Sequence, residues 1–212
     1  MFTALGISLI TKSGLGTSPV TSFAYVLTFI FPEVSLGVFA FLVNATVFLA
    51  EALLLGREFR PLQFLQLPAT FVFSSCIDLW MWLFRSWAPG SYPAEWVLLL
   101  VGCAVLGLGV ALQVTAGVLT LPCEGFVKVL SHKFRWNFGV VKTVFDVSMV
   151  TAAVVLSFAC LHGLFGVREG TVAAALTVGF FSRSFQKRLV HLPEGRKAAK
   201  KAEHEEINKA AA

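Results

Sequence analysis

Apolar stretches close to membrane-spanning length recur along the chain, separated by short connectors rich in Gly, Pro and charged residues. A helix rises 1.5 Å per residue, so about 20 apolar residues cross a hydrocarbon core about 30 Å thick. The pattern predicts helical segments over Phe2–Thr11, Ser18–Phe31, Leu36–Leu55, Leu62–Phe84, Trp96–Thr115, Leu121–Leu130, Phe138–Leu161 and Thr171–Leu189. The first of these is too short for a complete span. We therefore expect an all-α polytopic membrane protein.

The segments repeat in one order. Three matches carry the repeat: residues 6–19 (GISLITKSGLGTSP) with 109–122 (GVALQVTAGVLTLP), 36–44 (LGVFAFLVN) with 138–146 (FGVVKTVFD), and 71–74 (FVFS) with 179–182 (GFFS). The sequence predicts a single membrane domain over residues 1–190, with repeat one at 1–84 and repeat two at 95–190. Each repeat is expected to hold three transmembrane helices and one short, broken or re-entrant helix.

Each short helix follows a break that contains Gly and precedes Pro. The first begins at Thr17-Ser18-Pro19, a hydroxyl cap followed by Pro in the first turn. About 14 residues reach only about 21 Å, short of the hydrocarbon core. Broken backbone is tolerated at membrane depth only inside protein or beside a wet cavity. Paired interruptions of this kind are typical of transporter binding sites, so we expect the two breaks to lie side by side near the midplane.

Charge supports an inverted arrangement of the two repeats. Because each repeat is expected to have an odd number of spans, the second repeat has the opposite orientation in the membrane to the first. With residues 191–212 as a basic cytoplasmic tail, the loops with Arg57 and Arg60 and with Lys133 and Arg135 also fall inside. If the short helices crossed the membrane, Arg57 and Arg60 would lie outside. We expect six spans, with the C-terminus in the cytoplasm of a bacterial cell and the protein in its cytoplasmic membrane.

Composition agrees with a membrane class. Hydrophobic residues make up 57% of the chain and charged residues 14%, against about a quarter in soluble domains. The net charge of +5 favours anionic lipid over nucleic acid as a partner. No secretory signal peptide is recognisable. The four cysteines are scattered, so neither a metal site nor a cofactor is expected. A 23.0 kDa chain is compatible with a homodimer.

The first break carries a family resemblance. The residues concerned are Lys12, Gly14, Leu15, Gly16, Ser18 and Pro19, followed by Asp78-Leu79, Gly170-Thr171 and Val178-Gly179. With them the chain resembles the YczE/YitT-like group of bacterial integral membrane proteins. Phe180 stands where the group's pattern has a proline. The resemblance implies a cytoplasmic-membrane protein with a possible transport role, and it brings no substrate.

The strongest candidates for chemistry are ionisable residues within apolar segments, because such residues are rare in membranes. Lys142 and Asp146 are four residues apart on one predicted helix face and can pair directly. Asp146 aligns with Asn44 in the first repeat. Two interpretations stay open: a central substrate or proton site with Asp146 as the titrating group, or a structural ion pair that joins the halves.

The breaks supply further candidates. Thr17 and Ser18 begin the first short helix without a carboxylate, which makes its positive end a seat for an anion beside Lys12. Glu124 opens the second short helix, either as a stabilising charge at its N-terminus or as a cation or proton site. Gln113 precedes the second break and can satisfy loosened backbone there. Our hypothesis is that these residues together bind an anionic or zwitterionic solute.

The remaining polar residues have simpler interpretations. Glu51 and Arg183 fall near cytoplasmic ends, where long side chains can snorkel to water. Asp78 is expected in the outer half of its span, in a solvated cavity or linked to Arg85. Phosphate-binding, zinc-protease and serine-hydrolase motifs are absent from the sequence, so we expect that the protein is not an enzyme.

The sequence thus predicts a secondary transporter of a small polar solute, with alternating access around a site between the two breaks. The alternative is a non-transporting accessory or docking protein that uses the basic tail 191–212. A passive channel is the third possibility.

Overall fold

The computed structural model describes all residues except 57–58, 60, 88, 117–119 and 191–212. The described chain is all-helical. Its elements are α1 (Phe2–Lys12), α2 (Pro19–Ile30), α3 (Leu36–Leu55), the 3₁₀ turn η2 (Pro61–Leu65), α4 (Gln66–Leu83), α5 (Tyr92–Ala116), α6 (Pro122–Lys133), α7 (Phe138–Leu161) and α8 (Glu169–Val190). The predicted basic tail 191–212 lies outside the described residues.

Four of the described helices are long and apolar enough to cross a membrane: α3, α4 with the residues just before it, α5 and α7. The protein is therefore a helical membrane protein, as its composition predicts. Helices α1 and α2 are apolar but shorter. Helix α8, predicted as a full span, does not reach the same apolar length, because polar residues such as Arg183 and Gln186 occupy its later turns.

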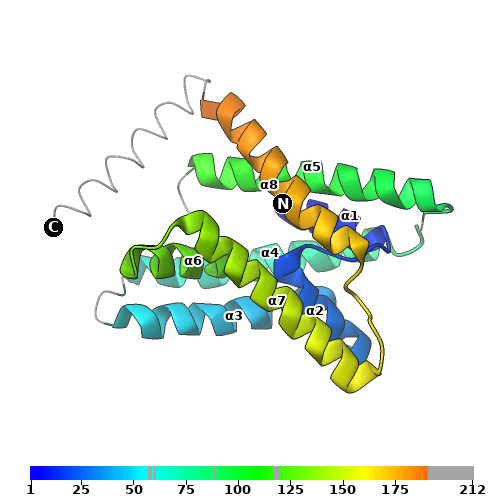
Figure 1. The fold of residues 1–212 in the computed structure, drawn as a ribbon, viewed down its shortest axis with the longest axis horizontal. Helices are drawn as coiled ribbons and strands as arrows, with labels where there is room; N and C mark the ends of the chain where they lie inside the picture. The colour runs from blue at the N-terminus through cyan, green and yellow to red at the C-terminus, as the bar shows by residue number, and fades with distance from the viewer. Residues whose placement is uncertain (57–58, 60, 88, 117–119, 191–212) are drawn as a thin grey trace.

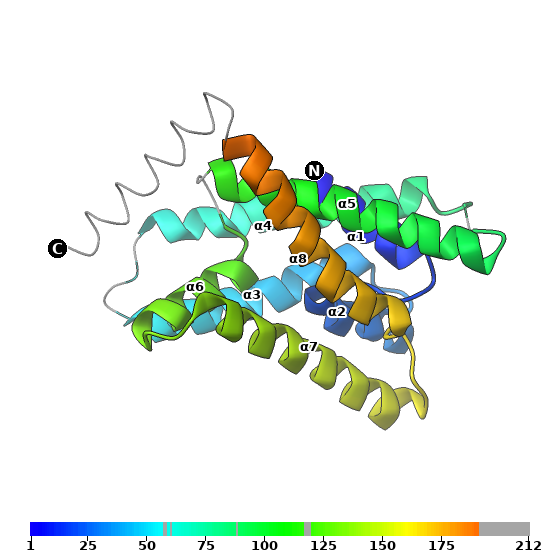
Figure 2. The ribbon, with the colours of Figure 1, turned by 45° about the horizontal axis from the view of Figure 1, so that its top comes forward.

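Helix α5 packs extensively against both α1 and α8. Helix α4 packs on α1 and on α3. The short helices cross between the halves of the chain: α2 packs on α7, and α6 packs on α3. Figures 1 and 2 show α3, α4 and α5 roughly aligned along the long dimension, with α7 and α8 running obliquely to them.

Glycines bring α1 and α5 into close contact. A Cβ atom added at Gly6 would lie 2.5 Å from the Leu106 backbone nitrogen, and one added at Gly109 would lie 2.6 Å from the Thr3 nitrogen. Gly102 similarly faces Ile10. The contacts pair early residues of α1 with late residues of α5, so the two helices are antiparallel. Close backbone approach through small residues is typical of membrane helix packing.

Asp78 anchors α4 to the start of α3. Its Oδ2 accepts a hydrogen bond from Ser35 Oγ at 2.7 Å, and its Oδ1 accepts one from the Gly37 N–H at 2.7 Å. Ser35 in turn caps α3 by accepting from the Val38 N–H at 3.2 Å. The carboxylate therefore sits at the positive end of a helix, where it is stabilising. This is the structural role of Asp78, in place of the predicted solvated cavity or link to Arg85.

We expect Asp78→Ala to lower the free energy of unfolding by about 1–2 kcal/mol, because two hydrogen bonds at the start of α3 are lost. Thermal unfolding of the protein in detergent micelles, followed by tryptophan fluorescence, measures the effect. Ser75→Ala on the same helix is the control, since Ser75 is exposed and donates to the Phe71 carbonyl of its own helix. Equal unfolding temperatures for the two variants would contradict the capping role.

Candidate functional site

The first break, Gly14–Pro19, folds against the start of α8. The Gly170 N–H donates to the Leu15 carbonyl at 2.9 Å, and the Thr17 N–H donates to Thr171 Oγ1 at 3.3 Å. Arg168 Nη1 donates to the Gly14 carbonyl at 3.0 Å. Groups from the start of α8 and the residue before it thus satisfy three backbone groups of the first break.

Hydroxyl groups fill the interior of this break. Thr17 is fully buried and its Oγ1 lies 2.9 Å from Thr11 Oγ1. Ser18 is also buried, and its hydroxyl bonds to that of Thr21. Lys12, half-buried, occupies the last turn of α1, where a cation complements the helix dipole. Because these hydroxyls already have partners within the protein, an anion seat at this end of α2 stays a prediction.

The second break lies far from the first. Residues 117–119, including Gly117, are outside the described part of the chain, but α5 ends at Ala116 just before them. The first break meets α5 near its other end, where Gly170 packs between Leu15 and Leu99. From Leu99 to Ala116 a helix extends about 25 Å. The structure therefore does not bring the two breaks side by side, and α2 and α6 lie toward opposite ends of the molecule (Figures 1 and 2).

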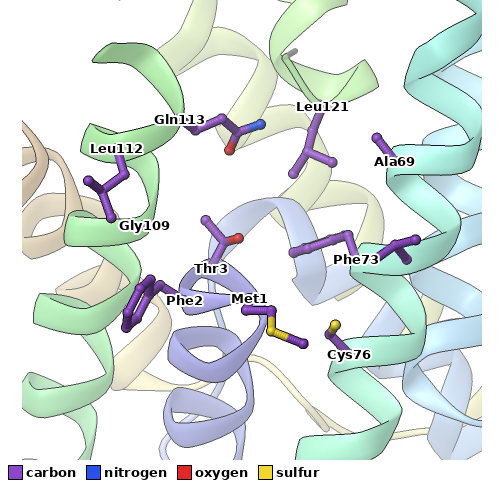
Figure 3. Close-up of a pocket in the computed structure, with 11 residues that line it drawn as sticks. Met1, Phe2, Thr3, Ala69, Phe73, Cys76, Gly109, Leu112, Gln113 and Leu121 are labelled. Atoms are coloured by element: carbon purple, nitrogen blue, oxygen red, sulfur yellow. The ribbon is translucent and has the colours of Figure 1, made fainter. Parts of the chain in front are cut away.

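A cavity of about 270 Å³ lies beside the second break (Figure 3). It is bounded by the start of α1, by α4 and by the later part of α5, with Leu121 on the side of the break. Most of its lining is apolar, including Phe73 and Cys76. Thr3 and Gln113 contribute polar side chains, and Figure 3 shows Thr3 at the start of α1 and Gln113 on α5, both in the space between α5 and α4. Gln113 thus lines a cavity beside the second break, and its expected role of satisfying loosened backbone there stays a prediction.

A charged cluster forms where α6 meets α7. Lys142 Nζ lies 2.7 Å from Asp146 Oδ1, so the direct pairing predicted from their spacing is confirmed. The side chains are 28% and 24% exposed. Glu124, in the first turn of α6, lies within electrostatic range of Lys142, Asp146 and Lys128. Carboxylates and amines are thereby gathered beside the second break.

Asn44 does not join this cluster. Its side chain is buried, and its Nδ2 donates to the Ala40 carbonyl of the same helix at 2.8 Å. Its partner in the sequence repeat, Asp146, is half-buried on α7. The two aligned positions therefore have different environments, and only the second carries a charge.

Comparison with known protein families assigns the chain to one family. A model described as a family of unknown function (DUF6198) matches residues 1–187. The chain belongs to this family. No curated protein and no solved structure matches the chain. The family match covers every described helix except the last turn of α8, and the resemblance to the YczE/YitT-like group stays a prediction.

Sequence reasoning missed Glu51. The expectation that it snorkels to water is wrong, because Glu51 is only 1% exposed and packs against Gly125 of α6. Gln63 and Gln66, from η2 and the start of α4, donate to its carboxylate. They lie 12 and 15 residues away in sequence, so helical spacing could not reveal the cluster. Arg183, by contrast, is exposed and bonds to its own helix at the Gly179 carbonyl.

Proposed function

We propose that the protein is a secondary transporter of a small polar solute, built from two inverted repeats that move against each other. The observation that best supports this proposal is the reciprocal contact between α1 and α5. The alignment that pairs Gly6 with Gly109 pairs Thr3 with Leu106 at the same offset. Gly6 packs on Leu106 and Gly109 packs on Thr3, so each contact is the image of the other when the halves are exchanged. Such reciprocity characterises two-fold related surfaces.

Antiparallel packing of α1 and α5 supports inversion of the second repeat, because equivalent helices of inverted repeats run in opposite directions. Two further pairs of helix contacts follow the same exchange, whereas among the described residues the α3–α4 contact has no counterpart of similar extent between α7 and α8. Helix α1 packs on α4 as α5 packs on α8, and α2 packs on α7 as α6 packs on α3. Each short helix thus contacts the third helix of the other half. A rocking motion of the halves would move both short helices together.

The proposed solute contacts lie at the α6–α7 cluster, where Glu124, Lys142 and Asp146 offer charges of both signs. A solute with both an amine and an acid group, or a neutral polar one, matches such a site. Intramembrane charges are retained at substrate and ion pathways because they are otherwise costly. Location in a bacterial cytoplasmic membrane, with a cytoplasmic C-terminus, belongs to the same proposal and rests on the distribution of Lys and Arg.

The test is solute uptake by the full chain reconstituted in phosphatidylethanolamine–phosphatidylglycerol vesicles, with a broad panel of labelled amino acids, sugars and organic acids. We expect Asp146→Asn to reduce uptake about tenfold or more, equivalent to roughly 1.4 kcal/mol of lost interaction. Glu33→Gln, a neutralised carboxylate in an exposed loop, should keep wild-type uptake. A panel in which no solute is moved by the wild type would overturn the transport proposal.

A double variant separates the two interpretations of the ion pair. Asp146→Asn alone leaves the Lys142 amine without its partner, which destabilises the fold as well as any site. Adding Lys142→Met removes that unpaired charge. If the pair is only structural, the double variant should recover both stability and uptake. If Asp146 serves the solute, the double variant should recover stability while uptake stays low.

A further inference from the structure

Glu51 occupies a closed junction of three elements. It lies in the last turns of α3, and its carboxylate faces Gly125 in the first half of α6, while η2 and the start of α4 cover it from the other side. A Cβ added at Gly125 would lie 2.9 Å from Glu51 Oε2 and 3.2 Å from Oε1. The absence of a side chain at Gly125 therefore makes room for this carboxylate.

The carboxylate is incompletely bonded. Gln63 Nε2 and Gln66 Nε2 both donate to Oε1, each at 3.4 Å, near the outer limit for a hydrogen bond. Within the described residues Oε2 has no partner, and Gln66 Oε1 also has none. Both orphaned atoms are acceptors when Glu51 is ionised, so they cannot satisfy each other. Orphaned polar atoms in a closed interior are costly and call for an explanation.

Among the described residues, no charged group around this junction forms an ion pair with Glu51. Among the described residues, the ion pairs are Lys142–Asp146 and Arg168–Glu169. From α6, Glu124 precedes Gly125, Lys128 is exposed, and Lys133 Nζ donates to the Leu54 carbonyl at 2.5 Å.

In the part of the chain that the structure describes, the other elements packed on α3 bring no cation to Glu51. From α4, Asp78 is bonded to Ser35 and Gly37 at the far end of α3, and α2 contributes only Tyr25 as a titratable group. Arg57, Glu58 and Arg60 lie outside the described part of the chain.

We propose that Glu51 is a proton-binding site, occupied at neutral pH with the proton on Oε2. One proton removes the negative charge from the interior and turns the orphaned Oε2 from an acceptor into a donor. The Gln66 amide, whose Oε1 is the free acceptor of the cluster, is the group to receive that hydrogen bond. A buried ionised carboxylate without a cation is strongly destabilising, and the proton avoids this cost.

A metal cation fits the site less well than a proton. Na⁺, Mg²⁺ and Ca²⁺ require several oxygen ligands, usually with more than one carboxylate for the divalent ions. The described residues contain no group of three or more His, Cys, Asp or Glu side chains placed to share an ion. The described side chains that bond to the Glu51 carboxylate are the amides of Gln63 and Gln66.

The position of the proton links it to movement of α6. Loss of the proton would leave a charge on Oε2 against the Gly125 backbone carbon, and hydrating that charge requires α6 to separate from α3. Glu124, beside Gly125, belongs to the α6–α7 cluster. This assignment rests on the proposed transport function: Glu51 is the site that couples proton binding to movement of α6. The bound proton favours packing of α6 on α3, and release of the proton favours displacement of α6.

Infrared difference spectroscopy of the full chain in lipid nanodiscs tests proton binding directly, without any transported solute. At neutral pH, the wild type should show the carbonyl stretching band of a protonated carboxyl group, and Glu51→Gln should lose it. Glu33→Gln, the exposed control, should lose only ionised carboxylate absorption. Gln66→Leu leaves Glu51 intact and should shift the protonated band, because its acceptor is removed. This variant keeps the test valid if Glu51→Gln fails to fold.

An ionised Glu51 band at neutral pH would overturn the inference, whether the partner proves to be an arginine or a metal ion. A carboxylate band that moves when Na⁺ is exchanged for Mg²⁺ would identify the metal. In vesicles, Glu51→Gln should abolish the dependence of uptake on an imposed pH gradient. If the protonated band is present but no solute is transported, proton binding stands and the transport proposal fails. If uptake depends on Asp146 but Glu51 is ionised, transport stands and the coupling site fails.

Discussion

Replacing Gly6 by alanine is expected to force α1 away from α5 and to lower the free energy of unfolding by about 1–3 kcal/mol. The new methyl group would lie 2.5 Å from the Leu106 nitrogen and 2.6 Å from its Cα. These are backbone atoms of a helix, so they cannot rotate aside as a flexible side chain can. The whole contact must open. The intrinsic preference of helices for alanine over glycine, about 1 kcal/mol, offsets only part of the loss.

The same substitution at Gly109 should have a similar cost, because its methyl group would meet the Thr3 backbone in the reciprocal contact. One outward shift of α5 relieves both overlaps. The double variant Gly6→Ala, Gly109→Ala should therefore cost clearly less than the sum of the single variants, as expected for residues coupled through one backbone movement.

Thermal unfolding in detergent micelles, with tryptophan fluorescence as the signal, measures all three variants. Gly179→Ala is the matched control within a long helix, since a methyl group there would only approach Arg183 Nη2 at 3.7 Å, an ordinary contact. The control should be neutral or stabilising. A neutral Gly6→Ala, or costs at Gly6 and Gly109 that simply add, would contradict the reciprocal packing.

The sequence located most helices well, and capping residues explain why. Helices Leu36–Leu55 and Phe138–Leu161 have the predicted bounds to the residue. Their starts are fixed by Ser35 and Asn137, whose side chains accept from Val38 and Gly139. Where no capping side chain marks the start of a helix, the predicted and observed bounds differ. The span predicted to begin at Leu62 starts instead with the 3₁₀ turn η2, and α4 begins after it.

Packing partners were much harder to predict. The repeat placed Gly6 and Gly109 at equivalent positions, but nothing local indicates that their helices contact each other. The spans are apolar on all sides, so periodicity does not identify which face meets which neighbour. For the same reason the expected meeting of the breaks failed: α5 separates them by most of its length. Glu51 was missed because its burial depends on Gly125 of the other repeat.

Gly16→Ala is expected to be more damaging than Gly14→Ala, the substitution of the other glycine in the first break. Gly16 has φ +122°, a conformation that side-chain-bearing residues rarely adopt, at a cost of about 1–3 kcal/mol. In addition, its methyl group would overlap Thr171 Oγ1 and lie 3.2 Å from the Arg168 and Thr171 nitrogens. The combined loss should reach about 2–4 kcal/mol, because strain and overlap both apply.

Gly14→Ala separates these two causes, since Gly14 also has positive φ, +77°, but a methyl group there would meet nothing within 4 Å. The loss of stability in Gly14→Ala should therefore come from backbone strain alone. Adding Thr171→Ala to Gly16→Ala removes the overlapping hydroxyl and should recover part of the loss, although Thr171→Ala by itself sacrifices the bond to the Thr17 N–H. Unfolding in micelles reports each step. Equal losses at Gly14 and Gly16 would mean that the first break is not pressed against α8, and the interface of the two halves at this end would need another description.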